Sequence, residues 1–417
     1  MASSSVKKSS PTQPSAALLT IGNELLTGRT LNTNTTFLGG ELTRLGFRVF
    51  QQQACPDNNA DIHQALGRLA SSQLLILTGG LGPTPDDLTR EALAAYFGVP
   101  LKFSKSQFQA MQAIYRKLGK ILPLLSRQEA YYPANAQPLI NRFGIALGFW
   151  IQNHEQLMIV LPGVPTELQK MFLHDVKPLL LKKFHGLQAD KTLSIHTVGI
   201  SEPRIIEKLK RDFFAMPFQF GIYPSEGETQ ICIRSPSQKM IQTLRKKIQQ
   251  RIGQYIYSWK DETLAELIGQ LLVKQKKTLS VAESCTGGSL AFSWTRHAGA
   301  SRYFRGGVVV YDASAKSGIG VSKTVIKKHG QVSAAVAEEL AKSARAFFNT
   351  DYGIGVTGIA GPAGGSAQKQ VGLVYISIFS SARKRVTEKF LFWGNRDQIQ
   401  RKAVIKAQEL LWRILIA

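Results

Sequence analysis

The sequence predicts an α/β protein made of two αβα domains joined by a small α+β domain. Two observations predict this class. Strand-like apolar runs alternate with helical apolar spacing near both ends of the chain, and a middle stretch breaks that alternation. The balance of 44% hydrophobic and 19% charged residues over 417 residues is typical of a folded protein with two or three domains.

The first αβα domain is expected over residues 16–175. Apolar runs typical of buried strands occur at 16–21, around Val49, at 74–77 and at 157–161. Helical spacing of apolar residues occurs at 33–47 and 62–69. This alternation predicts a parallel, doubly wound sheet that binds its ligands at the carboxyl ends of the strands.

The other two domains follow. Residues 176–258 are expected to form an α+β connector, with strands and helices at 192–198, 205–209, 230–234 and 240–252. The second αβα domain is expected over residues 260–417. Its strands are expected at 278–282, 307–311, 352–356 and 371–378. Its helices are expected at 264–272, from about Ser289, at 336–348 and at 399–414.

The chain shows no signal for export or membrane insertion. Residues 1–15 are rich in Ser, Lys and Pro without an apolar core, which favours a disordered leader over a transit peptide and argues against a secretory signal. No apolar run approaches the roughly 18 residues that cross a bilayer. Cys55, Cys232 and Cys285 form no disulfide framework or CxxC metal pair, so we expect a cytoplasmic protein.

The net charge of +24 is spread along the chain. A basic surface can serve nucleic acid, an anionic membrane or phosphorylated substrates. The basic runs at 245–247 and 383–385 stop at three residues, and no recognisable DNA-reading helix is present. We therefore interpret the charge as a solvated surface and expect neither nucleic acid nor a membrane as a partner.

A glycine-rich loop in the first domain has the composition of a phosphate-binding turn. It follows the strand at 74–77 and contains Gly79, Gly80, Gly82 and Thr84. Four carboxylates that follow strands or this loop are candidate ligands of a divalent metal: Glu24, Asp57, Asp86 and Asp87. The alternative for Asp86 and Asp87 is that they cap a helix that begins near Leu88.

The strongest chemical signal in the second domain is a strand-to-helix turn, Ser284-Cys285-Thr286-Gly287-Gly288. Such a turn directs backbone N–H groups at an anion or a developing oxyanion. Ser284 can be a nucleophile there or a helix N-cap, and Cys285 is a rival nucleophile or a packing residue. Lys316 is a candidate base because it follows the strand end at Tyr311 and is expected to lie outside the middle of a helix. The pattern leaves these alternatives open.

Several motifs of this domain, in order, resemble the C-terminal domain of the CinA family. They are Ala282 to Gly288, Tyr311 with Lys316, Gly330 to Ser333, and Gly358 to Pro362. The resemblance implies a nicotinamide-nucleotide amidase, which converts nicotinamide mononucleotide to nicotinate mononucleotide and ammonia. It implies Ser284 and Lys316 as the catalytic dyad, Tyr311 as their neighbour, Arg396 as the phosphate anchor, and a homodimer.

The implied mechanism needs no cofactor. Neutral Lys316 takes the proton of Ser284, and the alkoxide attacks the carboxamide carbon. Backbone N–H groups at Thr286, Gly287 and Gly288, or in the loop at Gly358, are expected to stabilise the oxyanion. The family segment between tyrosine and lysine is typically Ser-Asn-Glu-Ala, whereas here it is Asp312-Ala313-Ser314-Ala315. Ala363 and Gln368 also stand where acidic residues are common.

The N-terminal half resembles the molybdopterin-binding-like domain that begins CinA proteins. The matching segments are 22–28, 78–87 and 162–167. This resemblance implies a metal-dependent ADP-ribose pyrophosphatase. The sequence departs from the family at Asn32, where Asp is usual, and at Gly144-Ile145-Ala146-Leu147-Gly148, where Gly-Thr-Ala-Pro-Gly is usual.

Three functions remain open at this point. The first is the amidase, with or without pyrophosphatase activity in the N-terminal domain. The second is mainly a pyrophosphatase whose amidase has decayed around Asp312 to Ser314. The third is a competence-related nucleic-acid adaptor without enzymatic activity, which would bind DNA with a steep dependence on salt.

Overall fold

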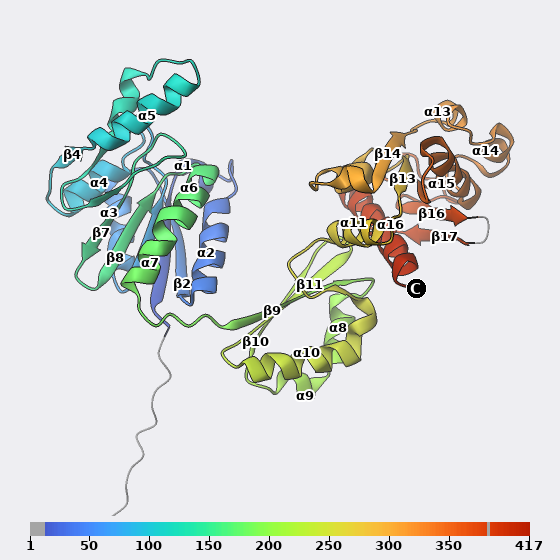
Figure 1. Cartoon of the computed structure of the whole chain (residues 1–417), viewed down its shortest axis with the longest axis horizontal. Helices are drawn as coiled ribbons and strands as arrows, with labels where there is room; N and C mark the ends of the chain where they lie inside the picture. The colour runs from blue at the N-terminus through green and yellow to red at the C-terminus, as the bar shows by residue number, and fades with distance from the viewer. Residues whose placement is uncertain (1–12, 382–383) are drawn as a thin grey trace, which may run out of the picture. The chain divides into compact units, whose positions relative to one another are not determined.

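The computed structural model describes residues 13–381 and 384–417 and divides them into two compact units, up to Asp190 and from Lys191 (Figure 1). The predicted leader at residues 1–15 lies mostly outside the described residues, and Ser15 already begins the first strand. In the described part of the chain, no helix has the length and apolar character needed to span a membrane. Both αβα domains and the small α+β domain are present, so the predicted fold class is confirmed.

The first unit contains a six-stranded sheet in the order β2-β1-β3-β8-β7-β6 and a separate β4-β5 pair. Its strands are β1 Ser15–Ile21, β2 Arg48–Cys55, β3 Leu74–Thr78, β4 Leu101–Phe103, β5 Tyr131–Pro133, β6 Gln137–Leu139, β7 Gly148–Asn153 and β8 Gln156–Leu161. Its helices are α1 Asn23–Leu26, α2 Thr33–Leu45, α3 Asn59–Leu69, α4 Thr89–Tyr96, α5 Lys105–Lys117, η1 Leu124–Ala130, α6 Pro165–Met171, η2 Phe172–Val176 and α7 Lys177–Lys183.

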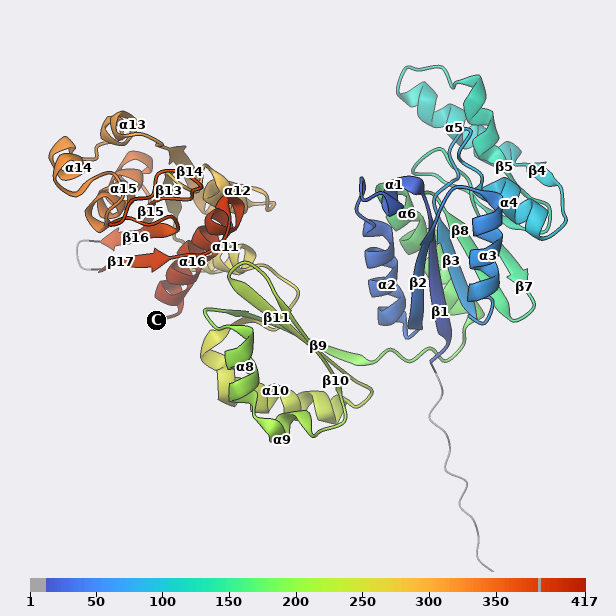
Figure 2. The same cartoon turned by 180° about the vertical axis from the view of Figure 1, so that it is seen from behind.

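Helices cover both faces of this sheet, as Figure 2 also shows. The prediction of an all-parallel sheet is correct only for β2, β1, β3 and β8, because β7 and β6 are antiparallel. The short β7–β8 connection explains the difference, since a tight hairpin joins only antiparallel strands. The unit also continues beyond residue 175 through α7.

The second unit begins with a four-stranded antiparallel sheet in the order β10-β11-β9-β12. Its elements are β9 Lys191–Val198, α8 Glu202–Leu209, α9 Arg211–Phe214, β10 Gln219–Pro224, β11 Glu228–Ser235, α10 Gln238–Ile252, η3 Gly253–Tyr255 and β12 Ile256–Ser258. The sequence predicts only two of these strands. Gly221 and Pro224 weaken the strand signal of β10, and β12 is only three residues long.

The rest of the second unit forms a five-stranded sheet in the order β14-β13-β15-β16-β17. Its strands are β13 Leu279–Glu283, β14 Phe304–Val309, β15 Tyr352–Gly358, β16 Leu373–Ser381 and β17 Lys384–Leu391. Its helices are α11 Leu264–Lys274, α12 Ser289–Thr295, η4 Ala300–Arg302, α13 Ala313–Gly318, α14 Lys323–His329, α15 Ala334–Phe348 and α16 Arg396–Ile416. Helices α11 and α16 pack on one face and α15 on the other.

Strand β13 lies between β14 and β15, and all three run parallel. The carboxyl end of β13 is therefore enclosed by two neighbouring strand ends, which is where an open α/β sheet places its ligands. Helix α15 lies unusually close to β15. A Cβ atom at Gly355 would lie 2.2 Å from the carbonyl oxygen of Ala337.

We expect Gly355→Ala to loosen α15, because backbone atoms cannot move aside for the added methyl group. Overpacking of this kind costs about 1–3 kcal/mol. Amide hydrogen exchange in α15 should therefore become faster. The matched control is Gly318→Ala in α13, where an added Cβ meets open space and exchange in α15 should stay unchanged. Equal protection of α15 in Gly355→Ala and the wild type would contradict this packing argument.

Candidate active site

Ser284 lies in a tight turn between β13 and α12. Its backbone N–H donates to the carbonyl of Val356 at 3.0 Å, which ties the turn to β15. Gly287 and Gly288 have φ values of +61° and +97°, a region that glycine enters without steric cost. The N-cap of α12 is Gly288, with no side-chain cap hydrogen bond, so the alternative that Ser284 caps this helix is wrong.

Lys316 meets Ser284 in the interior of the domain. Its Nζ donates to Ser284 Oγ at 3.1 Å and to the carbonyl oxygen of Tyr311 at 3.2 Å, and only 1% of the lysine surface is exposed. The expectation that Lys316 lies outside the middle of a helix is wrong, because it is the fourth residue of the six-residue helix α13. That helix has only six residues, too few to show a periodic apolar pattern in the sequence.

The segment that departs from the family pattern begins this helix. Asp312 is the N-cap of α13: its carboxylate accepts from the Ala315 N–H at 2.7 Å and from the Ser314 hydroxyl at 2.9 Å. Asp and Ser are both favoured N-cap residues. The change from the usual serine therefore keeps the helix start that carries Lys316 toward Ser284.

Burial lowers the pKa of the Lys316 ammonium below its usual range. The carboxylate of Asp312 acts in the opposite direction, favouring the charged form. The lowered pKa increases the share of neutral amine at a given pH. A neutral amine hydrogen-bonded to a serine hydroxyl is placed to accept its proton.

Glu283 is a buried polar residue of this turn that the sequence analysis does not single out. Its carboxylate accepts from the backbone N–H groups of Gly288, Leu290 and Ala291 at 2.8–3.1 Å. It therefore occupies the positive end of α12. The signal available in the sequence is an acidic residue at the end of an apolar strand, directly before the serine turn.

These contacts narrow the choice of oxyanion donors. The N–H of Gly288 donates to Glu283, and the N–H of Gly287 donates to the carbonyl of Ser284 at 3.1 Å. Within residues 13–381 and 384–417, neither the N–H of Cys285 nor that of Thr286 donates to another backbone carbonyl, and the buried Thr286 hydroxyl has no partner. Residues 285 and 286 thus offer unused donors next to Ser284.

Cys285 is placed as a packing residue. Its side chain is buried in the main core cluster of the domain, and burial raises the pKa of its thiol to about 12. The thiolate is the nucleophilic form of cysteine, so this thiol is poorly suited to attack at neutral pH. Its carbonyl oxygen accepts from Gln400 Nε2 at 2.8 Å, which ties the turn to α16.

Arg396 and Tyr311 form the exposed edge of this region. Arg396 is the first residue of α16, whose N-cap Asn395 forms a capping box with Gln398. The Arg396 guanidinium donates to the Tyr311 hydroxyl at 2.6 Å and to the carbonyl of Gly361 at 2.7 Å. Gly358, the remaining predicted contact, ends β15 two residues beyond the Val356 carbonyl that holds Ser284.

The first unit gathers its predicted residues around a cavity of about 450 Å³ at the carboxyl ends of its strands. Most of the predicted residues line it: Glu24, Asp57, Gly79, Gly80, Gly82, Asp86 and Asp87. Thr84 supports the loop instead, because its N–H donates to Asp87 at 2.9 Å. The buried Arg90 also holds the loop through the carbonyls of Leu81 and Gly82, at 2.6 and 3.0 Å.

The carboxylates around this cavity affect one another. Burial raises the pKa of Asp57, and the charges of Glu24, Asp86 and Asp87 raise it further, against a backbone hydrogen bond from Asn23. The helix-capping alternative for Asp86 and Asp87 is wrong, because the N-cap of α4 is Leu88 and no side chain caps it. Among the described residues, no three His, Cys, Asp or Glu side chains form a ready-made metal cluster.

Two further acids face the same cavity and were missed from the sequence. Burial raises the pKa of Glu129 to about 7, and it also raises that of Glu167, which accepts from Asn141 at 2.6 Å. Glu129 lies on η1, which follows an irregular segment, so no strand-end pattern marks it. Glu167 lies on α6, close to the end of β8 and within the matching segment 162–167, but it was not named as a ligand. Asn32, which replaces the usual Asp, caps α2.

Comparison with known families agrees with this arrangement of two αβα domains. The family model described as "Probable molybdopterin binding domain" matches residues 17–182. The model described as "CinA C-terminal domain" matches residues 261–415. Each match covers one of the domains that carry the candidate residues.

Similar proteins extend over nearly the whole chain. A CinA-like protein of Kosmotoga olearia is 35% identical over 410 residues, which cover 96% of this chain and 99% of the relative. A CinA-like protein of Thermosynechococcus vestitus is also 35% identical, over 413 residues, which cover 96% of this chain and 99% of the relative. The chain therefore belongs to the CinA family.

Solved structures of CinA proteins match part of the chain. CinA from Thermoplasma acidophilum is 32% identical and covers 40% of this chain and 99% of its own, with a TM-score of 0.37. A CinA superfamily protein from Escherichia coli is 29% identical and covers 36% of this chain and 88% of its own, with a TM-score of 0.35.

The burial of Cys285 predicts its reactivity. In the native protein, iodoacetamide should modify Cys232, which is partly exposed, while Cys55 and Cys285 should react only after denaturation. Peptide mass spectrometry after timed labelling measures this order. The Cys232→Ser variant controls for the accessible site and should remove most native labelling. Rapid modification of Cys285 in the folded chain would contradict its assignment as a packing residue and make it a candidate nucleophile again.

Proposed function

We propose that the C-terminal domain hydrolyses the carboxamide of nicotinamide mononucleotide to nicotinate mononucleotide and ammonia. The observation that carries this proposal is the hydrogen bond of 3.1 Å between the buried Lys316 amine and the Ser284 hydroxyl. Membership of the CinA family agrees with it. We further propose that the protein works as a homodimer in the cytoplasm, on small nucleotide substrates.

The proposed reaction proceeds through an acyl-enzyme. Neutral Lys316 accepts the proton of Ser284 as the serine oxygen attacks the carboxamide carbon. The N–H groups of Cys285 and Thr286 and the hydroxyl of Thr286 are the unused donors in this turn for the oxyanion that develops. Protonated Lys316 then donates that proton to the amide nitrogen, which leaves as ammonia when its bond to carbon breaks, and water hydrolyses the ester to release the carboxylate and restore the serine.

The substrate phosphate is proposed to bind Arg396. Its guanidinium is held by Tyr311 and Gly361 through one N–H on each terminal nitrogen. A guanidinium has five N–H donors, so three stay available for phosphate oxygens. This leaves the charged end of the substrate at the exposed edge and directs the neutral carboxamide toward the buried dyad.

We predict that Ser284→Ala and Lys316→Ala each lower ammonia release from nicotinamide mononucleotide by at least about a thousandfold, since members of a catalytic unit cannot act alone. The control is Ser289→Ala, an exposed serine on the same turn that should keep wild-type turnover. A coupled ammonia assay measures all of these variants. Wild-type turnover in Ser284→Ala would contradict the assignment of Ser284 and Lys316 as the catalytic dyad.

The pH dependence tests the role of Asp312. A lysine base is active when neutral, so activity should rise as pH increases through the pKa of Lys316. The charge of Asp312 raises that pKa, and asparagine keeps the N-cap without the charge. Asp312→Asn should therefore move the rising limb of the pH–rate profile of kcat/KM to lower pH. An unmoved limb, or a shift to higher pH, would contradict the assignment of Lys316 as the base.

A second activity is proposed for the N-terminal cavity, namely metal-dependent hydrolysis of ADP-ribose. The observation that favours it is that the four predicted carboxylates and the glycine-rich loop line the same cavity of about 450 Å³. Carboxylates whose charges oppose one another suit a hard divalent cation. Since no three of the described carboxylates form a ready-made cluster, Glu24, Asp57, Asp86 and Asp87 would have to draw together around the cation, which would neutralise the diphosphate.

Asp86→Ala combined with Asp87→Ala should abolish release of AMP from ADP-ribose in the presence of magnesium, because the diphosphate charge would then lack its counter-ion. Ser284→Ala should retain this activity fully, since it lies in the other unit. Chromatographic detection of AMP measures both. If the double variant still cleaves ADP-ribose at the wild-type rate, these carboxylates do not serve the reaction.

A further inference from the structure

The segment from Lys105 to Arg127, here called the arm, extends α5 away from the body of the first unit (Figure 1). Its base is firmly anchored. The buried Gln107 donates to the carbonyl of Ile145 at 2.7 Å and accepts from the N–H of Asn141 at 2.9 Å, and Met111 is fully buried. The arm is thus attached to the loops above the sheet.

The tip of the arm exposes large aliphatic side chains. Ile121 and Leu124 are each 93% exposed, and Leu118 and Leu125 are more than half exposed. Isolated exposed apolar residues are common, but four within eight positions concentrate apolar surface at the tip of the arm. Such surfaces on folded proteins mark sites of contact with another apolar phase.

The charge of the arm has a single sign. It contains Lys105, Arg116, Lys117, Lys120 and Arg127 and no acidic residue. Within the described residues, Arg116, Lys117 and Lys120 form no ion pair, and Arg127 instead lies over the ring of Phe103 at 4.9 Å. The partner of this surface must therefore be anionic.

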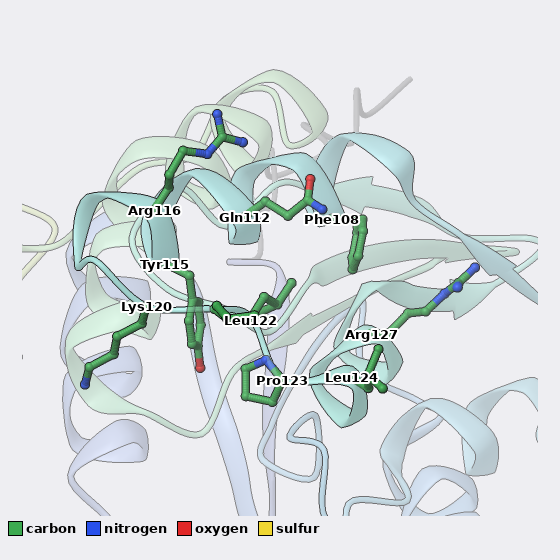
Figure 3. Close-up of a pocket in the computed structure, with 10 residues that line it drawn as sticks. Phe108, Gln112, Tyr115, Arg116, Lys120, Leu122, Pro123, Leu124 and Arg127 are labelled. Atoms are coloured by element: carbon green, nitrogen blue, oxygen red, sulfur yellow. The ribbon is translucent and has the colours of Figure 1, made fainter.

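A hollow of about 370 Å³ lies between α5 and the segment that follows it. Figure 3 shows Leu122 and Pro123 beside the ring of Tyr115, with the ring of Phe108 farther along α5. The cationic groups of Arg116, Lys120 and Arg127 point outward around this hollow (Figure 3). An apolar interior with a cationic rim matches an amphipathic anion.

We propose that the arm binds the surface of an anionic lipid bilayer, with Ile121 and Leu124 inserted among the acyl chains and the cations at the phosphate level. This departs from the expectation of no membrane partner, and it involves peripheral binding rather than a spanning segment. Stable peripheral binding to a membrane needs two contributions, and the arm offers both: apolar side chains that insert and basic residues that attract anionic lipid headgroups. A second copy of the arm fits poorly, because it would bring five cations against five.

Vesicle co-sedimentation of the full chain tests this proposal. Vesicles of phosphatidylcholine mixed with phosphatidylglycerol should bind the wild type, and vesicles of phosphatidylcholine alone should not. The double variant Ile121→Ser, Leu124→Ser should bind at least about tenfold more weakly, because the lost apolar burial exceeds the 1.4 kcal/mol that a factor of ten requires. Arg116→Gln with Lys120→Gln should also bind more weakly and lose salt dependence.

The matched control is Leu31→Ser, which removes an 84% exposed leucine from the same unit outside the arm and should keep wild-type binding. Equal loss in Leu31→Ser, or no binding to the anionic vesicles, would overturn the proposal. So would equally tight binding of the wild type and the Ile121→Ser, Leu124→Ser variant to soluble polyglutamate, since that result indicates an acidic protein partner. A dimer that the same double variant converts to a monomer, without vesicle binding, would assign the surface to a second copy.

Discussion

The chemistry proposed for this CinA-family protein depends on one contact, the hydrogen bond between Lys316 and Ser284 inside the C-terminal domain. An amine is a useful base only when it is neutral, and burial is what lowers its pKa here. Burial alone would leave the amine without partners. The carbonyl of Tyr311 provides one acceptor and the serine provides the other, so the amine is satisfied without a hydrogen bond to a carboxylate.

The surrounding structure holds this pair in place from several directions. Glu283 occupies the positive end of α12, and the Ser284 N–H is fixed to β15. Asp312 begins the short helix that carries the lysine. Together these contacts leave the N–H groups of Cys285 and Thr286, with the Thr286 hydroxyl, as the unused donors beside the serine. The sequence pattern indicates all the N–H groups of the turn, and the contacts limit the free donors to these two residues.

The sequence was sufficient to predict the fold class and to predict at which strand ends most candidate residues lie. Strand-end logic works because parallel strands end at one edge of a sheet, so Asp57 and the loop at Gly79 meet although they are distant in sequence. It fails for features without a periodic or strand-end signal. Lys316 lies on a helix too short to show a pattern, and Glu129 reaches its cavity from an irregular segment. The antiparallel β7 depends on a hairpin, which apolar runs alone do not distinguish from a parallel strand.

The central claim is that Ser284, deprotonated by Lys316, forms a covalent acyl-enzyme. The most direct measurement is peptide mass spectrometry after rapid acid quench of the protein reacting with nicotinamide mononucleotide. The account predicts an ester on the peptide that contains Ser284, present in the wild type and absent from Lys316→Ala. An adduct on Cys285, or steady product formation with no adduct at any quench time, would contradict it.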